Sequence, residues 1–181
     1  MNTLKLLCLS TMLVTLIGCP YRTEHSLGTP GADKVDAALI GHWKSVEKSA
    51  LVSELTIDTS DAYELVVEIL ESGSEFEEQT TKFFGFTTKF ADHNWVYFWP
   101  DRADGPQGYY YFTYHFDDEG KLVTRELTES KAKAANPETR ADFKKYIEEN
   151  MEEGEILSPE LKWALKPVEE KEESQKKAEQ K

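Results

Sequence analysis

The chain has 181 residues, of which 39% are hydrophobic and 12% aromatic, enough for one domain with its own apolar core. Its formal net charge is −13, from 21 basic and 34 acidic residues. This acidic excess argues against binding to nucleic acid and against adhesion to anionic lipid through basic patches, because both depend on lysine and arginine. The two cysteines, Cys8 and Cys19, lie near the amino terminus, so a chain that has lost Cys8 forms no internal disulfide.

The first 18 residues have the pattern of an export signal. Lys5 supplies a positive charge, and an apolar run from Leu6 to Ile17 follows it. This run is shorter than the roughly 20 apolar residues of a membrane-spanning helix. Its end, Leu16-Ile17-Gly18-Cys19, resembles the lipobox of bacterial lipoproteins, in which leucine stands three positions before an obligatory cysteine and a small residue stands just before it.

The resemblance implies that the thiol of Cys19 receives a diacylglyceryl group, and that signal peptidase recognises Leu16, Ile17 and Gly18 and cuts before the cysteine. The new amino group then usually takes a fatty acyl chain such as palmitate. Two or three acyl chains anchor a protein firmly, whereas one binds marginally. Because Pro20 follows the cysteine in place of the aspartate that retains such proteins in the inner membrane, the resemblance implies the outer membrane in a Gram-negative host. An ordinary secretory signal and a buried helix are the alternative interpretations.

Two polar segments flank the expected domain. Residues 19–37 contain glycine and proline without an apolar period, and they predict a flexible tether behind the lipidated cysteine. Residues 169–181 are almost entirely charged or polar and predict a disordered tail. The globular domain is therefore expected over residues 38–168.

Within this domain the apolar residues mostly alternate with polar ones, which is typical of half-buried antiparallel strands. A segment rich in threonine and phenylalanine, residues 80–90, also predicts a strand, with Gly85 as a bend or bulge. Residues 117–120 predict the turn of a tight hairpin. The residues expected to share one face of their strand are Leu51, Leu55 and Ile57; Tyr63, Leu65, Val67 and Ile69; and Leu161, Trp163 and Leu165.

Two central segments, residues 94–99 and 109–116, are aromatic on both faces. Such stripes line cavities for apolar ligands or platforms for sugars, although packing in a core is their commoner role. One stripe is Trp95, Tyr97 and Trp99, and the other is Tyr110, Phe112, Tyr114 and Phe116. The candidate contacts for an apolar ligand are Trp95, Tyr97, Trp99, Tyr110 and Phe112.

One helix is expected over about residues 137–153. Asn136 is suited to the N-cap, Pro137 to the first helical position, and Gly154 to the stop. Four apolar residues then follow at helical spacing and form one stripe, which predicts that the helix covers an open end or a face of the sheet. They are Phe143, Tyr146, Ile147 and Met151.

The tripeptide Gly41-His42-Trp43 opens the first strand of the expected domain. It resembles the Gly-x-Trp motif that begins the first barrel strand of lipocalins and their small-barrel relatives, in which the tryptophan plugs the closed end. Some bacterial members of that family are outer-membrane lipoproteins. The family's later Thr-Asp-Tyr-type motif is absent, and no basic residue of the last strand aligns with the family's arginine. The expected fold class is mainly β: an antiparallel curved sheet or a small lipocalin-like barrel, with one α-helix in the C-terminal region.

The sequence carries no motif of a catalytic, metal or cofactor site. The four histidines lack the paired spacing of metal ligands, and thiol catalysis needs a cysteine that the mature chain does not offer. The chain has neither a Gly-x-Ser-x-Gly elbow nor a glycine-rich phosphate loop. The acidic turns near residues 101–105 and 117–120 lack the ligand spacing of a calcium loop. The histidines are His25, His42, His93 and His115.

We therefore expect a lipid-anchored protein of the cell envelope that binds a partner or an apolar ligand without catalysis or a cofactor. The membrane is its expected partner through the acylated Cys19. A lipocalin-like carrier with a true cavity is the first alternative, and an envelope hydrolase is the second.

Overall fold

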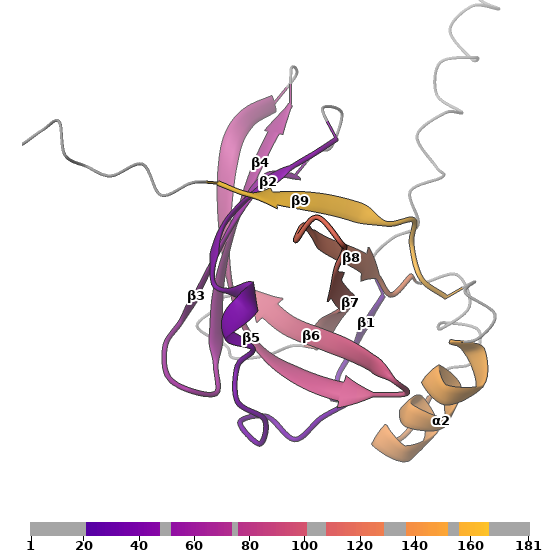
Figure 1. Cartoon of the computed structure of the whole chain (residues 1–181). Helices are drawn as coiled ribbons and strands as arrows, with labels where there is room; N and C mark the ends of the chain where they lie inside the picture. Colours follow the sequence, from indigo (N-terminus) through magenta and orange to yellow (C-terminus); the bar gives the residue numbers. More distant parts are fainter. Residues whose placement is uncertain are drawn as a thin grey trace, which may run out of the picture.

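The computed structural model describes residues 21–47, 52–73, 76–100, 108–128, 137–151 and 156–166, and these form a mainly β fold (Figure 1). The lipobox, Cys19 and the charged tail lie outside these ranges. The helices are η1 (Ala37–Leu39), a turn of 3₁₀-helix, and α2 (Arg140–Asn150). The strands are β1 (Arg22–Thr23), β2 (Gly41–Ser45), β3 (Val52–Thr59), β4 (Leu65–Gly73), β5 (Phe76–Phe90), β6 (His93–Pro100), β7 (Tyr109–Phe116), β8 (Leu122–Glu126) and β9 (Leu161–Leu165).

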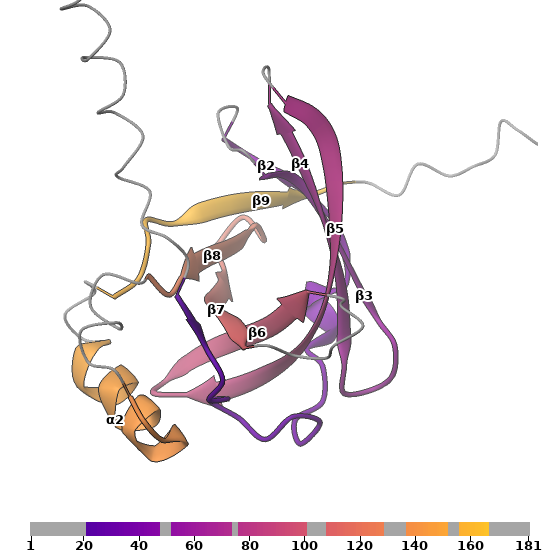
Figure 2. The same ribbon diagram turned by 180° about the vertical axis from the view of Figure 1, so that it is seen from behind.

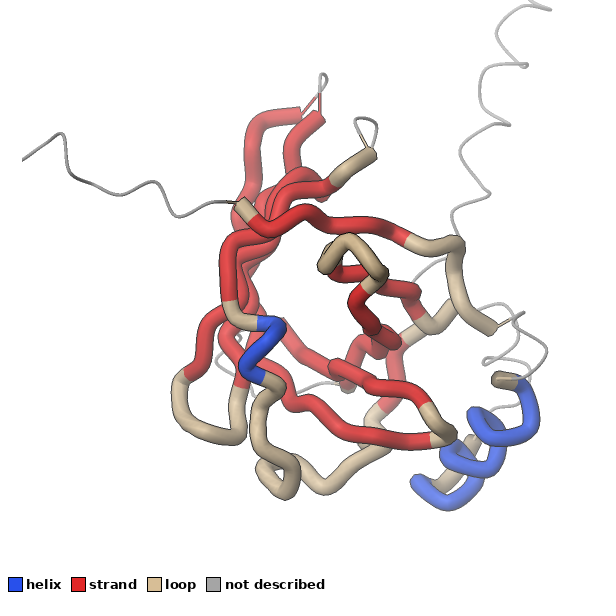
Figure 3. The backbone as a smooth tube through the Cα atoms, viewed as in Figure 1, coloured by secondary structure: helices blue, strands red, loops and turns tan. Residues whose placement is uncertain are grey.

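The strands β2 to β9 close into an antiparallel barrel. Each strand pairs with its successor in the chain, and β9 pairs with both β8 and β2 to complete the ring. Figure 3 shows this ring of strands with η1 at its near side. The short β1 adds to the beginning of β7. The expectation of a mainly antiparallel β fold with one late α-helix is confirmed, and of the two expected arrangements the sheet adopts the small closed barrel.

The inner face of the barrel carries most of the residues that alternation assigned to one side of their strands. The exceptions are Tyr63 and Leu165, which are 39% and 55% exposed, so the expectation is wrong for these two, and Leu51 lies outside the described residues. The inward-facing residues join others from β2, β7, β8 and β9 in an inner cluster. Trp43 is 2% exposed, and its indole nitrogen donates a hydrogen bond to the carbonyl oxygen of Leu39 at 2.8 Å. This bond ties η1 to the first barrel strand. The buried members of the inner cluster are Leu39, Trp43, Ile57, Leu65, Val67, Tyr114, Leu122 and Trp163.

The helix α2 packs against the outer face of β6 and β7, and in Figures 2 and 3 it lies outside the ring of strands. The ring of Phe143 lies 5.2 Å from that of Tyr111 and 6.1 Å from that of Tyr21. The predicted apolar stripe of the helix is therefore its buried side. We call this second core the outer cluster; it consists of Tyr21, Leu27, Trp95, Tyr97, Tyr111, Leu127, Phe143, Tyr146, Ile147, Met151, Ile156 and Leu157.

The helix begins three residues later than the expected position at Pro137. Thr139 is the N-cap, because its side-chain oxygen accepts a hydrogen bond from the backbone nitrogen of Asp142 at 3.2 Å. The Thr139 hydroxyl in turn donates to the Asp142 carboxylate at 2.6 Å, so cap and first turn support each other. The helix ends at Asn150, and the predicted stop at Gly154 lies outside the described residues.

The expectation of a flexible tether over residues 19–37 is wrong from Tyr21 onward. The Tyr21 side chain is 8% exposed, that of Leu27 is 1% exposed, and both belong to the outer cluster. The backbone nitrogen of Tyr21 donates to the carbonyl oxygen of Leu127 at 3.1 Å, and the hydroxyl of Tyr111 donates to the carbonyl oxygen of His25. Isolated apolar residues and backbone pairing hold this segment, neither of which produces a periodic sequence signal.

Gly85 forms the last pair of β5 with β4, and the register of β5 with β6 continues through it without a shift, so it is not the predicted bulge. A Cβ atom at this position would lie 2.8 Å from the Cβ of Phe98 and 2.9 Å from the carbonyl oxygen of Tyr97. Glycine is therefore required by the close approach of β6.

Replacing Gly85 with alanine is expected to lower the free energy of unfolding by about 1–3 kcal/mol, because β6 must shift to admit the methyl group. Urea unfolding monitored by circular dichroism measures the change. Thr56→Ala on the exposed side of β3 is the control and is expected to change stability by less than about 0.5 kcal/mol. Equal stabilities of the two variants would contradict the steric explanation.

Candidate functional site

The barrel interior presents apolar side chains that are only partly buried. These side chains pack against the inner cluster, yet solvent still reaches them. The interior therefore offers apolar surface to a ligand. The partly buried residues are Leu55, Ile69, Phe83, Val96, Phe116 and Leu161.

Four aromatic rings form one continuous wall on the inner face of β5, β6 and β7. Phe98 stacks on Phe112 with 5.1 Å between ring centroids and an angle of 12° between the planes. Phe83 meets Phe98 edge-on at 5.0 Å, and Tyr110 lies 6.3 Å from Phe98. We call Phe83, Phe98, Tyr110 and Phe112 the aromatic wall. Such rings supply a large apolar contact area at fixed geometry, which suits an apolar ligand.

The five predicted ligand contacts are divided between the two faces of the barrel. Tyr110 and Phe112 belong to the aromatic wall. Trp95 and Tyr97 are 0% exposed within the outer cluster, so they are core residues and not ligand contacts. Trp99 also lies on the outer face, where its ring is 5.6 Å from that of Tyr109. These three residues lie outside the barrel because side chains alternate between the two faces of a strand, and the odd-numbered aromatic residues of β6 fall on the outer face.

Phe83 and Phe98 are the wall residues that the sequence pattern did not single out as ligand contacts. Phe98 has the opposite parity to Trp95, Tyr97 and Trp99 on β6, and its cross-strand partner on β7 is Tyr110. The alternation of side chains shows which residues share a face of the strand. It does not indicate which side of an all-apolar strand becomes the interior.

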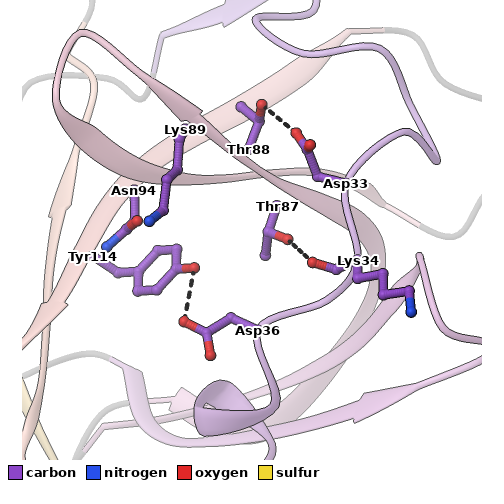
Figure 4. Close-up of a pocket in the computed structure, with 8 residues that line it drawn as sticks. All are labelled: Asp33, Lys34, Asp36, Thr87, Thr88, Lys89, Asn94 and Tyr114. Carbon is purple, nitrogen blue, oxygen red and sulfur yellow. Dashed lines mark hydrogen bonds between the residues drawn. The ribbon is translucent and has the colours of Figure 1, made fainter.

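A polar pocket of about 490 Å³ lies where η1 meets the barrel (Figure 4). The segment before η1 forms one side of this pocket, and β5, β6 and β7 form the other. Its lining residues are Asp33, Lys34, Asp36, Thr87, Thr88, Lys89, Asn94 and Tyr114.

Hydrogen bonds across this pocket join the η1 segment to the barrel wall. The Tyr114 hydroxyl donates to the Asp36 carboxylate at 3.2 Å, and the Thr88 hydroxyl donates to that of Asp33 at 2.8 Å. The Thr87 hydroxyl donates to the carbonyl oxygen of Lys34 at 3.3 Å. Burial, followed by the neighbouring charge of Asp36, raises the pKa of Tyr114, so its hydroxyl remains a proton donor. These contacts fix the barrel end and provide no nucleophile with an adjacent base.

The histidines stay apart from one another. His42 contacts Glu54 on the exposed side of the barrel, with 2.9 Å between Nε2 and Oε2. Glu54 also accepts a hydrogen bond from Lys166, and this bond is the main cause of the lowered pKa of the Glu54 carboxyl group. His93 and His115 are exposed. Across the described ranges, no group of three or more histidine, cysteine or acidic residues is placed to hold a metal ion.

In the part of the chain that the structure describes, no helix is both long and apolar enough to span a membrane. No protein-family model matches the chain, and comparisons with curated proteins and with solved structures give no match.

Proposed function

We propose that this protein is a lipid-anchored, non-catalytic protein of the cell envelope that holds an apolar ligand inside its barrel. The observation that carries the proposal is the set of partly exposed apolar side chains on the inner face of a closed barrel. Filled interiors are the rule in small barrels, whereas barrels that hold a small ligand keep accessible apolar surface inside. The aromatic wall would provide the largest share of the contact.

The packing of the amino-terminal segment supports a role close to the bilayer. Cys19, the proposed acylation site, stands two residues before Tyr21, which spans at most about 8 Å of extended chain. Tyr21 itself is buried against α2 and bonded to Leu127. Acyl chains on Cys19 would therefore hold the domain directly at the membrane surface. An apolar ligand would then move between the bilayer and the barrel over a short path through water.

The experiment compares the same substitution on the two faces of the barrel. Val96 lies on the inner face of β6 opposite Phe112, whereas Val66 pairs with Phe84 on the outer face of β4. The mature chain with Cys19→Ser, so that no lipid is attached, is titrated with the neutral apolar probe N-phenyl-1-naphthylamine. Binding is followed by probe fluorescence, and thermal unfolding confirms that each variant is folded.

Val96→Phe is expected to weaken probe binding by about tenfold or more, because the larger ring fills the space beside Phe112. Val66→Phe adds the same volume on the outer face and is expected to leave the affinity within about twofold of the parent chain. Absence of binding by the parent, or equal affinities of the two variants, would overturn the proposed function.

A further inference from the structure

Glu126 places a carboxyl group on the inner face of the barrel. In the β7–β8 register it lies opposite Phe112, a member of the aromatic wall. Leu122, four residues earlier on the same face of β8, belongs to the inner cluster. Leu127, the next residue along the chain, belongs to the outer cluster and so has the opposite orientation. The polar side chain of Glu126 is thus directed inward among apolar neighbours.

The Glu126 carboxylate has no hydrogen-bond or ion-pair partner among the described residues. The contacts of Glu126 with Ser158 use its backbone: its nitrogen donates to the Ser158 hydroxyl at 2.8 Å, and its carbonyl oxygen accepts from the Ser158 nitrogen at 2.8 Å. In the described ranges, the side-chain oxygens that lack both a partner and solvent are the hydroxyls of Tyr97 and Tyr146. Solvent therefore reaches the Glu126 carboxylate, which leaves it open to a ligand.

The surroundings of this carboxylate favour a cation. Burial alone raises the pKa of Glu126 to about 7, so no neighbouring cation offsets the cost of its charge. An unpaired carboxylate in an apolar interior reduces stability, and a positively charged partner relieves that cost. The faces of aromatic rings attract cations as well, and Phe112 stands directly across from Glu126 with Phe98 stacked against it.

We propose that the barrel recognises an amphiphile with a protonated amino group, which pairs with Glu126 while the apolar part of the ligand lies against Phe98 and Phe112. This inference rests on the proposed function and specifies the chemical class of its ligand. A charge-assisted hydrogen bond from the ammonium group to the carboxylate would supply selectivity, and the aromatic wall would supply contact area.

Three probes with the same alkyl chain and different head groups test this inference. Dodecylamine, dodecanol and dodecanoate are titrated below their micelle concentrations into the mature chain with Cys19→Ser at pH 8, and binding is measured by calorimetry. At this pH the amine is protonated, since its pKa is about 10 as for lysine, and Glu126 is largely ionised. Dodecylamine is expected to bind about tenfold or more tightly than dodecanol, and dodecanoate to bind most weakly.

Glu126→Gln is expected to remove the preference: dodecylamine affinity falls about tenfold or more, and dodecanol affinity stays within about twofold. Glu68→Gln, the same change on an exposed residue of β4, is the matched control for attraction of amines to the acidic surface and is expected to alter neither affinity. Dodecanol bound as tightly as dodecylamine, or dodecylamine binding unchanged in Glu126→Gln, would overturn this inference alone. If the parent chain binds none of the three probes, the proposed function fails with it.

Discussion

Replacing Trp43 with alanine is expected to lower the free energy of unfolding by about 3–5 kcal/mol, the usual cost of removing a large buried aromatic side chain. Trp43 is 2% exposed, and its ring lies 6.0 Å from that of Phe116 across the interior. Its backbone pairs with Leu55 of β3 on one side and Leu165 of β9 on the other. The substitution therefore opens a cavity at the seam where the last strand closes the barrel.

The same substitution also removes the hydrogen-bond donor to the carbonyl oxygen of Leu39. Denaturant unfolding followed by circular dichroism measures the total cost. Trp43→Phe retains a ring and loses only the donor and part of the volume, so we expect a smaller loss of stability. Tyr63→Ala removes an aromatic residue that is 39% exposed and serves as the control for truncation at the surface. If Trp43→Ala cost no more than this control, Trp43 would not be holding η1 against the barrel.

Replacing Cys19 with serine is expected to abolish lipid attachment and cleavage of the signal, so that an uncut precursor accumulates. Serine has no thiol to receive the diacylglyceryl group that the lipobox resemblance implies. Without two or three acyl chains the protein has no firm hold on the bilayer. Labelling of cells with radioactive palmitate measures lipid attachment, and membrane fractionation measures association with the bilayer. Mass spectrometry of the purified chain shows whether the signal has been cleaved.

Cys8→Ser is the matched control for the anchor, because it makes the same change within the leader and outside the lipobox. We expect this variant to be lipidated, cleaved and recovered with membranes like the parent chain. Normal processing of Cys19→Ser, together with its recovery in the membrane fraction, would refute the lipobox interpretation.

Local sequence patterns predicted most of the individual elements. Leu65, Val67 and Ile69, which the sequence placed opposite Glu64 and Glu68, form the inward side of β4. The helical spacing of Phe143 and Ile147 corresponds to the buried side of α2. These signals arise because each element has one apolar face and one polar face, which is a property of a few consecutive residues.

Closure of the barrel has no such local signal. It depends on pairing of β9 with β2, which joins segments from opposite ends of the domain, and β9 also pairs with β8. The indole nitrogen of Trp163 donates to the Thr124 hydroxyl at 2.9 Å across this seam. Alternation in β9 predicts which residues face inward, but it carries no information about the partner strands.

The face of β6 and β7 that becomes the barrel interior was equally beyond local patterns. Segments 94–99 and 109–116 are aromatic on both sides because β6 and β7 have the barrel interior on one side and α2 with the amino-terminal segment on the other. Sequence alone therefore gave Trp95 and Phe112 equal standing as contacts. Glu126 did not stand out either, because a glutamate at the end of a short strand usually faces solvent, and its inward orientation follows from its register with Phe112.

Xenon binding in crystals of the mature chain tests most directly whether the barrel contains an accessible apolar space. Xenon enters apolar cavities and is located by its strong electron density. We predict xenon inside the ring of strands, in contact with the aromatic wall and Ile69, and loss of that xenon in Val96→Phe. Pressurised crystals with no xenon inside the barrel, or with xenon bound only beneath α2, would contradict the proposal that the barrel interior is the ligand site.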